Sequence, residues 1–357
     1  MKTRTRFEKS AAAGLAAMIV LFFAVAAAAA PEAVDVEPLG SQRLSPDGFC
    51  RGNVGYGLLR LASQSPFQSL RMAFLPMTPD TLPQSAWEFG LHETLANVWV
   101  NENRYHMDYE TLHSAASLSY GLLDTVLLEL AFEERRLFGG VLDGFIEGFH
   151  DVTGIDQDGR DMAPSGDVLI DLRDEDGKRL LYYDGGSSAF TQAFTFSAQH
   201  NVTCGGDSWP AIAYAGTVRY EIWNITGLDQ DAPVDLGLSL SVSKRLWDVY
   251  LYLALGGVWY GANEVQELDL HRIQVSGLLG VEWNFHERAS LLLQYLMTEG
   301  RVKDLDAFSD ATHEVTLGAK VRLTRGLLLE LGLVENVIIY DNSPDFGIHA
   351  GLTWRIF

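Results

Sequence analysis

Six charged residues of both signs occupy equivalent places in segments where polar and apolar residues alternate. Each lies on the polar side of its segment and near one end. A ring of such side chains around an enclosed lumen can select ions or polar solutes. Alternatively, acids and bases in a lumen too narrow to conduct can simply pair with one another. The six lumen candidates are Glu88, Glu129, Glu282, Lys320, Arg322 and Glu330.

A short acidic loop offers a second kind of chemistry. Asp156, Asp158 and Asp161 place carboxylates at spacings found in calcium-binding loops. The stretch has no glutamate at the twelfth position of a full EF-hand loop, and a solvated turn rich in Asp and Gly has the same composition. The loop therefore indicates either a calcium site or an ordinary exposed turn, and the sequence indicates no other cofactor.

Catalytic motifs were sought among the nine histidines. Some outer-membrane phospholipases use His and Ser two residues apart on one strand, but no histidine here has a serine at that spacing. The chain also lacks the H-E-x-x-H zinc motif and the G-x-S-x-G nucleophile motif. His92, His113, His200 and His313 fall within alternating segments, where a hydrogen-bonded wall residue is the commoner role. Enzymatic activity is therefore left undecided, with the pattern favouring its absence.

The elements that position these residues are predicted to be long strands. Between Ile273 and Phe285, apolar residues alternate with polar ones throughout, and the same period of two recurs along the chain. The segments exceed the usual five or six residues of soluble strands and match the 9–11 residues of a tilted membrane strand. Twelve strands are predicted, near 85–100, 106–120, 125–135, 188–202, 209–223, 234–245, 248–261, 271–285, 289–299, 312–323, 327–338 and 346–357.

Twelve antiparallel strands predict a closed, all-β transmembrane barrel of the up-and-down type. An even count places both ends of the barrel on one side, and short turns alternate with longer loops, as in bacterial outer-membrane barrels. Closure satisfies every strand edge, which a membrane requires. A soluble β-sandwich is the alternative fold. Strand length and the Trp and Tyr residues at strand ends, such as Trp87, Trp99, Tyr120, Trp209 and Trp283, argue against it.

One stretch departs from the strand pattern. In residues 137–152, apolar residues recur at three and four positions, which predicts a helix in the long outer loop. Its glycines, four residues apart, form a ridge that permits close packing. The helix either folds into the mouth of the barrel as a constriction or lies along the outer rim at the lipid surface. In either place it could simply cap the barrel and stabilise it. Its proposed constricting residues are Phe138, Gly140, Gly144, Phe145, Gly148 and Phe149.

The N-terminus predicts export. Residues 1–29 combine a basic head, an apolar middle and a small-residue end, which is typical of a cleaved secretory signal peptide. Residues 30–84 then form a pre-barrel segment on the periplasmic side, and 85–357 form the barrel. The full chain has a formal charge of −21, and losing the basic head makes it more acidic still. Such a charge argues against nucleic acid as a partner.

Cys50 and Cys204 are the two cysteines of the chain. The strand count places the turn that holds Cys204 on the same side as the pre-barrel segment that holds Cys50. Both would therefore meet an oxidising compartment. A disulfide would pin the pre-barrel segment under or inside the barrel, whereas two independent thiols would leave that segment free.

Several motifs resemble one family. They are PFQSLRMAFLPM at 66–77, WEFGLHETLANVWV at 87–100, YGLLDTVLLEL at 120–130 and GFIEGFHDVTGIDQDGRD at 144–161. In these the chain resembles the proteobacterial outer-membrane proteins of domain-of-unknown-function family 3187. The C-terminal GLTWRIF also resembles the terminal signature of such barrels, except that Arg355 stands where an aromatic residue is usual. The resemblance implies an outer-membrane location and no particular activity.

The sequence as a whole predicts a channel or transporter for small molecules, of unknown solute, in the outer membrane of a Gram-negative cell. The alternatives are a non-conducting structural barrel and an enzyme that modifies outer-membrane lipids. The expected partners are outer-membrane lipid, lipopolysaccharide and the barrel-assembly machinery, together with a small-molecule solute.

Overall fold

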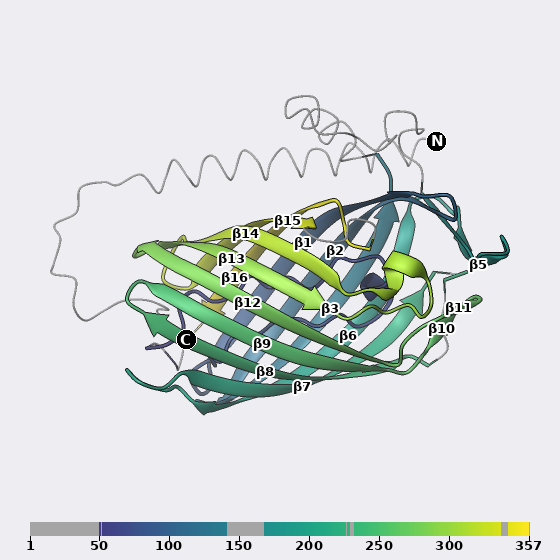
Figure 1. Cartoon of the computed structure of the whole chain (residues 1–357). Coiled ribbons are helices and arrows are strands. Elements are labelled where there is room, and N and C mark those ends of the chain that lie inside the picture. Colours follow the sequence, from purple (N-terminus) through teal and green to yellow (C-terminus); the bar gives the residue numbers. More distant parts are fainter. Residues whose placement is uncertain are drawn as a thin grey trace, which may run out of the picture.

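The computed structural model describes residues 50, 52–140, 168–225, 227–228, 232–336 and 342–356. Twelve long strands pair antiparallel, each with its neighbours, and β1 pairs with both β2 and β16, so that the sheet closes on itself (Figure 1). The wall strands are β1 (Trp87–Asn101), β2 (Tyr105–Leu123), β3 (Val126–Phe138), β6 (Ser188–Thr203), β7 (Ala211–Asn224), β8 (Val234–Leu246), β9 (Val249–Tyr260), β12 (Ile273–His286), β13 (Ala289–Thr298), β14 (Thr312–Arg322), β15 (Leu327–Asn336) and β16 (Phe346–Ile356).

The predicted twelve-stranded antiparallel barrel is confirmed. The alternation of polar and apolar residues gives the barrel a polar lumen and an apolar outer face, because successive side chains of a strand point to opposite faces. Along β12, for example, Gln274, Ser276 and Gly280 are buried while Val275 and Leu279 are exposed. Small and polar residues thus line the lumen, and apolar residues cover the outside.

Four short strands were not predicted from the sequence. In the loop between β3 and β6, β4 (Leu169–Arg173) and β5 (Arg179–Tyr183) form a flap, and β4 pairs with the first residues of β2. In the loop between β9 and β12, β10 (Glu264–Val265) and β11 (Leu268–Asp269) form a small hairpin. Segments of two to five residues are too short to show a period, and their pairing depends on the barrel that carries them.

The helix predicted over 137–152 does not begin where the sequence suggested. Leu137 and Phe138 are the last residues of β3, and both are buried. Gly140 has a φ of +84°, a left-handed conformation that interrupts a right-handed helix. Residues 141–152, which include Gly144, Phe145, Gly148 and Phe149, lie outside the described residues. The calcium candidates Asp156, Asp158 and Asp161 also lie outside them.

The outer face of the barrel is apolar, as contact with lipid requires. Leu238, Val275, Leu279 and Leu293 are among many apolar side chains that project from the middle of the wall and are more than half exposed. Tryptophans gather where the strands end at the short turns, as interfacial girdles do. These tryptophans are Trp87, Trp209, Trp247, Trp283 and Trp354. No helix among the described residues is both long and apolar enough to cross a bilayer.

The last strand has a definite facing. Trp354 and Ile356 point outward and are exposed, whereas Arg355 points to the lumen side and pairs with Glu88 of β1. The departure from the usual terminal aromatic pattern is thus explained by this ion pair across the seam between β1 and β16, where the barrel closes.

We expect the mature protein to run as a heat-modifiable barrel. A closed sheet has no free edge at which denaturant can begin to separate strands, so the protein should stay compact in cold dodecyl sulfate and migrate faster than after boiling. Electrophoresis with and without boiling measures the difference. Equal mobility of the two samples, together with solubility in buffer without detergent, would contradict the barrel.

Candidate functional site

Among the residues that the structure describes, one segment fills the lumen. Residues 50–86, which precede β1, enter at the short-turn end, rise to the long-loop end and return; we call this segment the plug. Its turn contains the 3-10 helix η1 (Gln68–Leu70). Pro66, Pro76, Pro79 and Pro83 have no backbone N–H to donate, which disfavours a strand ladder within the plug. The plug is therefore a hairpin without the hydrogen bonds of a sheet.

Side chains of the wall supply the missing hydrogen bonds. The two carboxylate oxygens of Glu282 accept the backbone N–H groups of Tyr56 and Gly57 at 2.9 and 3.0 Å. Gln294 accepts the N–H of Leu59 at 2.6 Å, and Glu314 accepts that of Gln64 at 2.9 Å. Each acceptor lies on an inward position of its strand. The rising limb of the plug is thus held by its backbone along the wall strands β12 to β15.

Glu330 is the most heavily bonded of these acceptors. One of its oxygens lies 2.9 Å from His349 Nε2 and 3.1 Å from His92 Nδ1, and it also accepts the N–H of Arg60 at 3.1 Å. The other oxygen pairs with Lys320 Nζ at 2.8 Å. This cluster joins the seam of the barrel to the middle of the plug.

The same cluster has the donor types of a metal site. His92, His349 and Glu330 bring their ligand atoms within 4.8 Å of one another. Imidazole and carboxylate ligands of this kind suit zinc or iron. In the structure, however, Lys320 and the plug already bond the Glu330 carboxylate, so its charge is compensated without an ion. The arrangement serves as an anchor of the plug.

The returning limb is held by a fully buried ion pair. Arg71 and Asp235 have side chains with no exposed surface, and the Arg71 guanidinium donates two bonds to Asp235 Oδ1 at 2.7 and 3.2 Å. Asp235 also accepts the N–H of Met72 at 3.2 Å. Arg219 lies 3.6 Å from the same carboxylate. The pair fixes the turn of the plug to β8 near the long-loop end.

A disulfide fixes the other end of the plug. Cys50 is bonded to Cys204, in the turn between β6 and β7, with 4.8 Å between the two Cα atoms and 154 residues of sequence separation. The N–H of Cys50 also donates to Asp80 Oδ1 at 2.8 Å, which joins the two limbs where they meet at the short-turn end. Closing so long a loop stabilises a fold by about 4–5 kcal/mol in the chain-entropy account.

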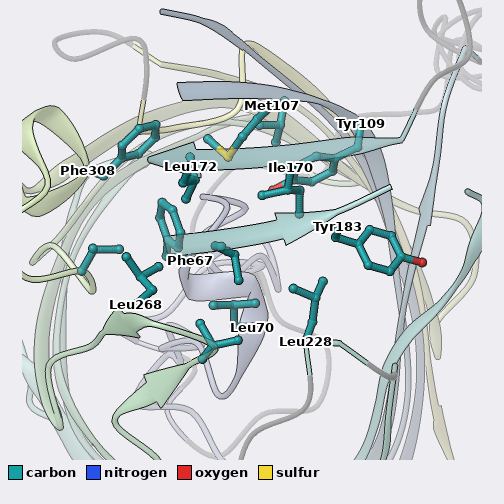
Figure 2. Close-up of a cluster of buried hydrophobic side chains, with 14 of the residues drawn as sticks. Phe67, Leu70, Met107, Tyr109, Ile170, Leu172, Tyr183, Leu228, Leu268 and Phe308 are labelled. Carbon is teal, nitrogen blue, oxygen red and sulfur yellow. The ribbon is translucent and has the colours of Figure 1, made fainter. Parts of the chain in front are cut away.

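The long-loop end is covered by an apolar cap. Figure 2 shows Phe67 and Leu70, from the turn of the plug, surrounded by side chains of the overlying loops. Ile170 and Leu172 come from β4, Leu268 comes from β11, and Phe308 stacks edge-on against Phe67 with 5.3 Å between ring centres. The turn of the plug is therefore part of the core that closes the mouth.

The flap also carries an ion pair beyond the barrel wall. Arg173 donates hydrogen bonds of 2.7 and 3.2 Å to Asp171, and these bonds hold the pKa of Asp171 below its ordinary value. A carboxylate with a lowered pKa stabilises the fold above the pKa of the unfolded chain, about 3.9, and this contribution is lost as pH falls through the folded-state pKa.

The lumen residues expected from the sequence lie on inward positions near the short-turn end. Glu282, Lys320 and Glu330 contact the plug directly, since Lys320 Nζ also donates to the carbonyl of Leu58 at 2.7 Å. Glu129 pairs with Arg60 of the plug at 2.6 Å, and Glu88 pairs with Arg355. Arg322 is different, because it donates to the carbonyl of Glu287 at the rim. These residues face the plug or the rim.

Sequence reasoning missed the wall residues nearer the long-loop end and the plug residues that meet them. Asp235 and Glu314 stand on inward positions, but each lies at the start of its strand, where a charged residue is ordinary. Arg60 and Arg71 lie in a segment without periodicity. The only available signal was that both arginines stand in an apolar, proline-containing stretch, which suggests burial against a counter-charge.

Together, the lipid-facing belt, the closed sheet and the filled lumen define an outer-membrane β-barrel. The chain belongs to the family described as "Protein of unknown function (DUF3187)", whose model matches residues 50–356. This match includes the plug as well as the barrel. No curated protein matches the chain.

Solved structures share the architecture at very low identity. The NanC porin is 6% identical, with a TM-score of 0.44 over 75% of this chain and all of that one. The KdgM porin in complex with disordered oligogalacturonate is 7% identical, with a TM-score of 0.40 over 76% and 99%. The Ralstonia pickettii toluene transporter TbuX is 8% identical, with a TM-score of 0.40 over 84% and 99%. Likenesses of this size leave the solute of this chain open.

We expect Asp235→Asn to lower the free energy of unfolding by about 3 kcal/mol or more. The substitution preserves volume but leaves the buried Arg71 without its closest counter-charge, and breaking a buried pair typically costs about 3–5 kcal/mol. Denaturant unfolding of the barrel in lipid vesicles, followed by tryptophan fluorescence, measures the change. The matched control is Glu267→Gln, which breaks the exposed pair with Lys178 and should cost less than about 1 kcal/mol. Equal effects of the two substitutions would show that Asp235 does not anchor the plug.

Proposed function

We propose that this protein is a gated outer-membrane channel or transporter for small molecules, in which the plug is the gate. The observation that carries the proposal is that the wall holds the plug through charged and amide side chains. Glu282, Gln294, Glu314, Glu330 and Asp235 all accept plug N–H groups. A barrel whose lumen served only as a rigid core could be filled with apolar side chains at lower cost.

The chemistry of these contacts supports a movable plug. Hydrogen bonds between wall carboxylates and plug N–H groups exchange for bonds to water at a net cost of about 1.5–3 kcal/mol each, because the acceptor is charged. If the plug moves away, it leaves a space lined by Glu, Gln, Lys and Ser side chains. Water can fill this space because the side chains are polar. An apolar interface would in addition leave hydrocarbon exposed in the vacated lumen, at about 25 cal/mol for each Å².

The conformation described here is the closed one. The disulfide holds the plug at the short-turn end, and Phe67 and Leu70 hold its turn within the apolar cap. Opening therefore requires the turn to leave the cap or the limbs to shift against the wall. The disulfide keeps the plug tethered in either case, so that it can return.

One observation favours a second function, a permanently closed structural barrel. The cap comprises more than twenty buried apolar residues drawn from the plug, the strand ends and four loops. Removing Phe67 and Leu70 from it would cost roughly 1.5–3 kcal/mol for each side chain. A barrel that never opens would gain stability from such a cap at no functional cost. The two functions differ in whether the plug moves under working conditions.

A protein of the outer membrane has to be exported from the cytoplasm and inserted into that membrane. We infer that residues 1–29 direct secretion and are removed, that 30–84 begin on the periplasmic side, and that the barrel-assembly machinery inserts the wall. The short turns then face the periplasm and the capped end faces lipopolysaccharide and the exterior. In this orientation the disulfide tethers the plug at the periplasmic end of the barrel, and the apolar cap closes the barrel at the end that faces the exterior of the cell.

Planar-bilayer conductance tests the proposal. We expect the oxidised wild type to be closed most of the time. A plug-release variant, Cys50→Ser with Cys204→Ser, Glu282→Gln and Glu330→Gln, should show open events severalfold more often, because it loses the tether and two anchors. Swelling of proteoliposomes in small neutral solutes provides an independent measure of passage.

The matched control carries Lys178→Gln and Glu267→Gln, which remove an exposed pair on the loops and leave the plug untouched. It should conduct like the wild type. Heat-modifiable migration on gels verifies that each barrel is folded. A folded plug-release variant without conductance or swelling would refute the gate and leave the closed structural barrel as the function.

A further inference from the structure

A cavity of about 70 Å³ lies inside the lumen, between the returning limb of the plug and the wall formed by β1, β2, β3 and β6 to β9. Its two sides differ in character. The returning limb contributes the apolar side chains of Met72, Phe74, Leu75 and Met77, and the rising limb contributes Arg60. The wall contributes polar and charged side chains of both signs, namely His92, His113, Arg135, Glu129 and Glu133. The cavity is thus amphipathic, with an apolar surface facing a polar surface of mixed charge.

Arg135 of β3 is the unusual member of this wall. Its residue is only 3% exposed, yet it has no carboxylate within 4 Å in the part of the chain that the structure describes. Its Nη1 atom is buried and has no hydrogen-bond partner there. Other lumen cations are paired, since Arg60, Arg71 and Lys320 each have a carboxylate oxygen within 2.8 Å. Glu133 and Glu314 attract the Arg135 guanidinium electrostatically from beyond 4 Å, but neither accepts a hydrogen bond from its buried Nη1. A buried donor without an acceptor is costly, and an ionisable residue of this kind inside a membrane barrel is a candidate binding residue.

Two imidazoles stand beside it. His113 of β2 is directly across from Arg135 in the pairing of β2 with β3, and Thr94 of β1 continues the same row. The Nε2 atoms of His113 and His92 are buried and have no hydrogen-bond partner among the described residues. The nearest carboxylate to His113 Nε2 is Glu133, at 3.9 Å, which is beyond hydrogen-bond distance. Within the described chain, Arg135 Nη1 therefore lines the cavity as a donor without an acceptor, and His113 Nε2 does the same in the tautomer that carries its proton there. His92 donates its Nδ1–H to Glu330, so its Nε2 is an acceptor in the neutral ring.

The carboxylates of the same wall are already engaged. Glu129 accepts bonds from Arg60 at 2.6 Å and from Ser119 at 2.9 Å. Glu133 accepts the hydroxyl of Thr195 at 2.9 Å. Arg135 Nη1 and, in its Nε2–H tautomer, His113 are donors that the described residues leave unsatisfied at the cavity, and an anion would complement them. Because a guanidinium binds carboxylates through two parallel hydrogen bonds, it is well suited to this ligand.

We propose that this cavity binds a short-chain carboxylate, with the carboxylate at Arg135 and His113 and the carbon chain against the plug. This inference rests on the proposed function and names the class of its solute. The volume of about 70 Å³ is about half that of an engineered cavity of about 150 Å³ that holds benzene, which has as many non-hydrogen atoms as butyrate. A short-chain carboxylate therefore enters only if the side chains of the plug move aside. Met72 and Met77 are flexible enough to adjust to chains of different length. A ligand in this place contacts the gate and the wall at once.

Butyrate is the probe, and the full mature protein in detergent micelles is the sample. Saturation-transfer NMR and isothermal titration should detect butyrate binding to the wild type, whereas butyramide, which has the same shape without the charge, should bind at least about tenfold more weakly. Arg135→Gln should weaken butyrate binding by about the same factor. Arg136→Gln is the matched control, because Arg136 is the next residue of β3, is paired with Glu134 and does not line the cavity.

His113→Leu is a second variant, which should also weaken butyrate binding and which keeps the test valid if Arg135→Gln does not fold. Heat-modifiable migration verifies the fold of each protein. Failure of the wild type to bind butyrate, equal binding of butyramide, or undiminished binding by folded variants would overturn the proposal. Binding is measured at equilibrium without passage, so its failure is distinct from a failure of the plug to conduct.

Discussion

The structure depends on one constraint, which is that a chain segment inside a closed lumen must still satisfy its backbone N–H groups. The plug cannot add a strand to a barrel that has no free edge, and four prolines disfavour a ladder of its own. Inward side chains of the wall therefore act as its acceptors. Gly55 shows how closely the two fit, because a Cβ at this position would meet the carboxylate of Glu282.

The plug and the apolar cap share residues, so that neither can move without the other. The turn that Arg71 anchors to Asp235 also contributes Phe67 and Leu70 to the apolar cap. At the opposite end, the disulfide and the contact of Cys50 with Asp80 hold both limbs together. Movement of the turn would therefore disturb the flap of β4 and β5, and a change in the loops would reach the plug. The cavity at Arg135 lies between these two ends, where it adjoins the returning limb.

Much of the wall was predictable from the sequence, and the site was predictable only in part. The alternation along β12 places Gln274 and Glu282 inward whatever surrounds them, so the lumen position of Glu282 could be inferred. Its partner could not, because the backbone of Tyr56 and Gly57 belongs to a segment without period. For Arg135 the inward position could likewise be inferred, but the sequence of its strand gives no sign that its Nη1 atom would lack a hydrogen-bond acceptor among the described residues.

The sequence by itself determined the twelve strands, the facing of all but the last of them and the lipid-exposed belt, because each follows from a local period of two and from the length of the segments. Only the tertiary structure decided that the lumen is filled. Contacts such as Arg71 with Asp235 or Arg60 with Glu330 join residues 164 and 270 positions apart. Such contacts depend on closure of the barrel and on the path of the plug, and no local pattern in the chain records either.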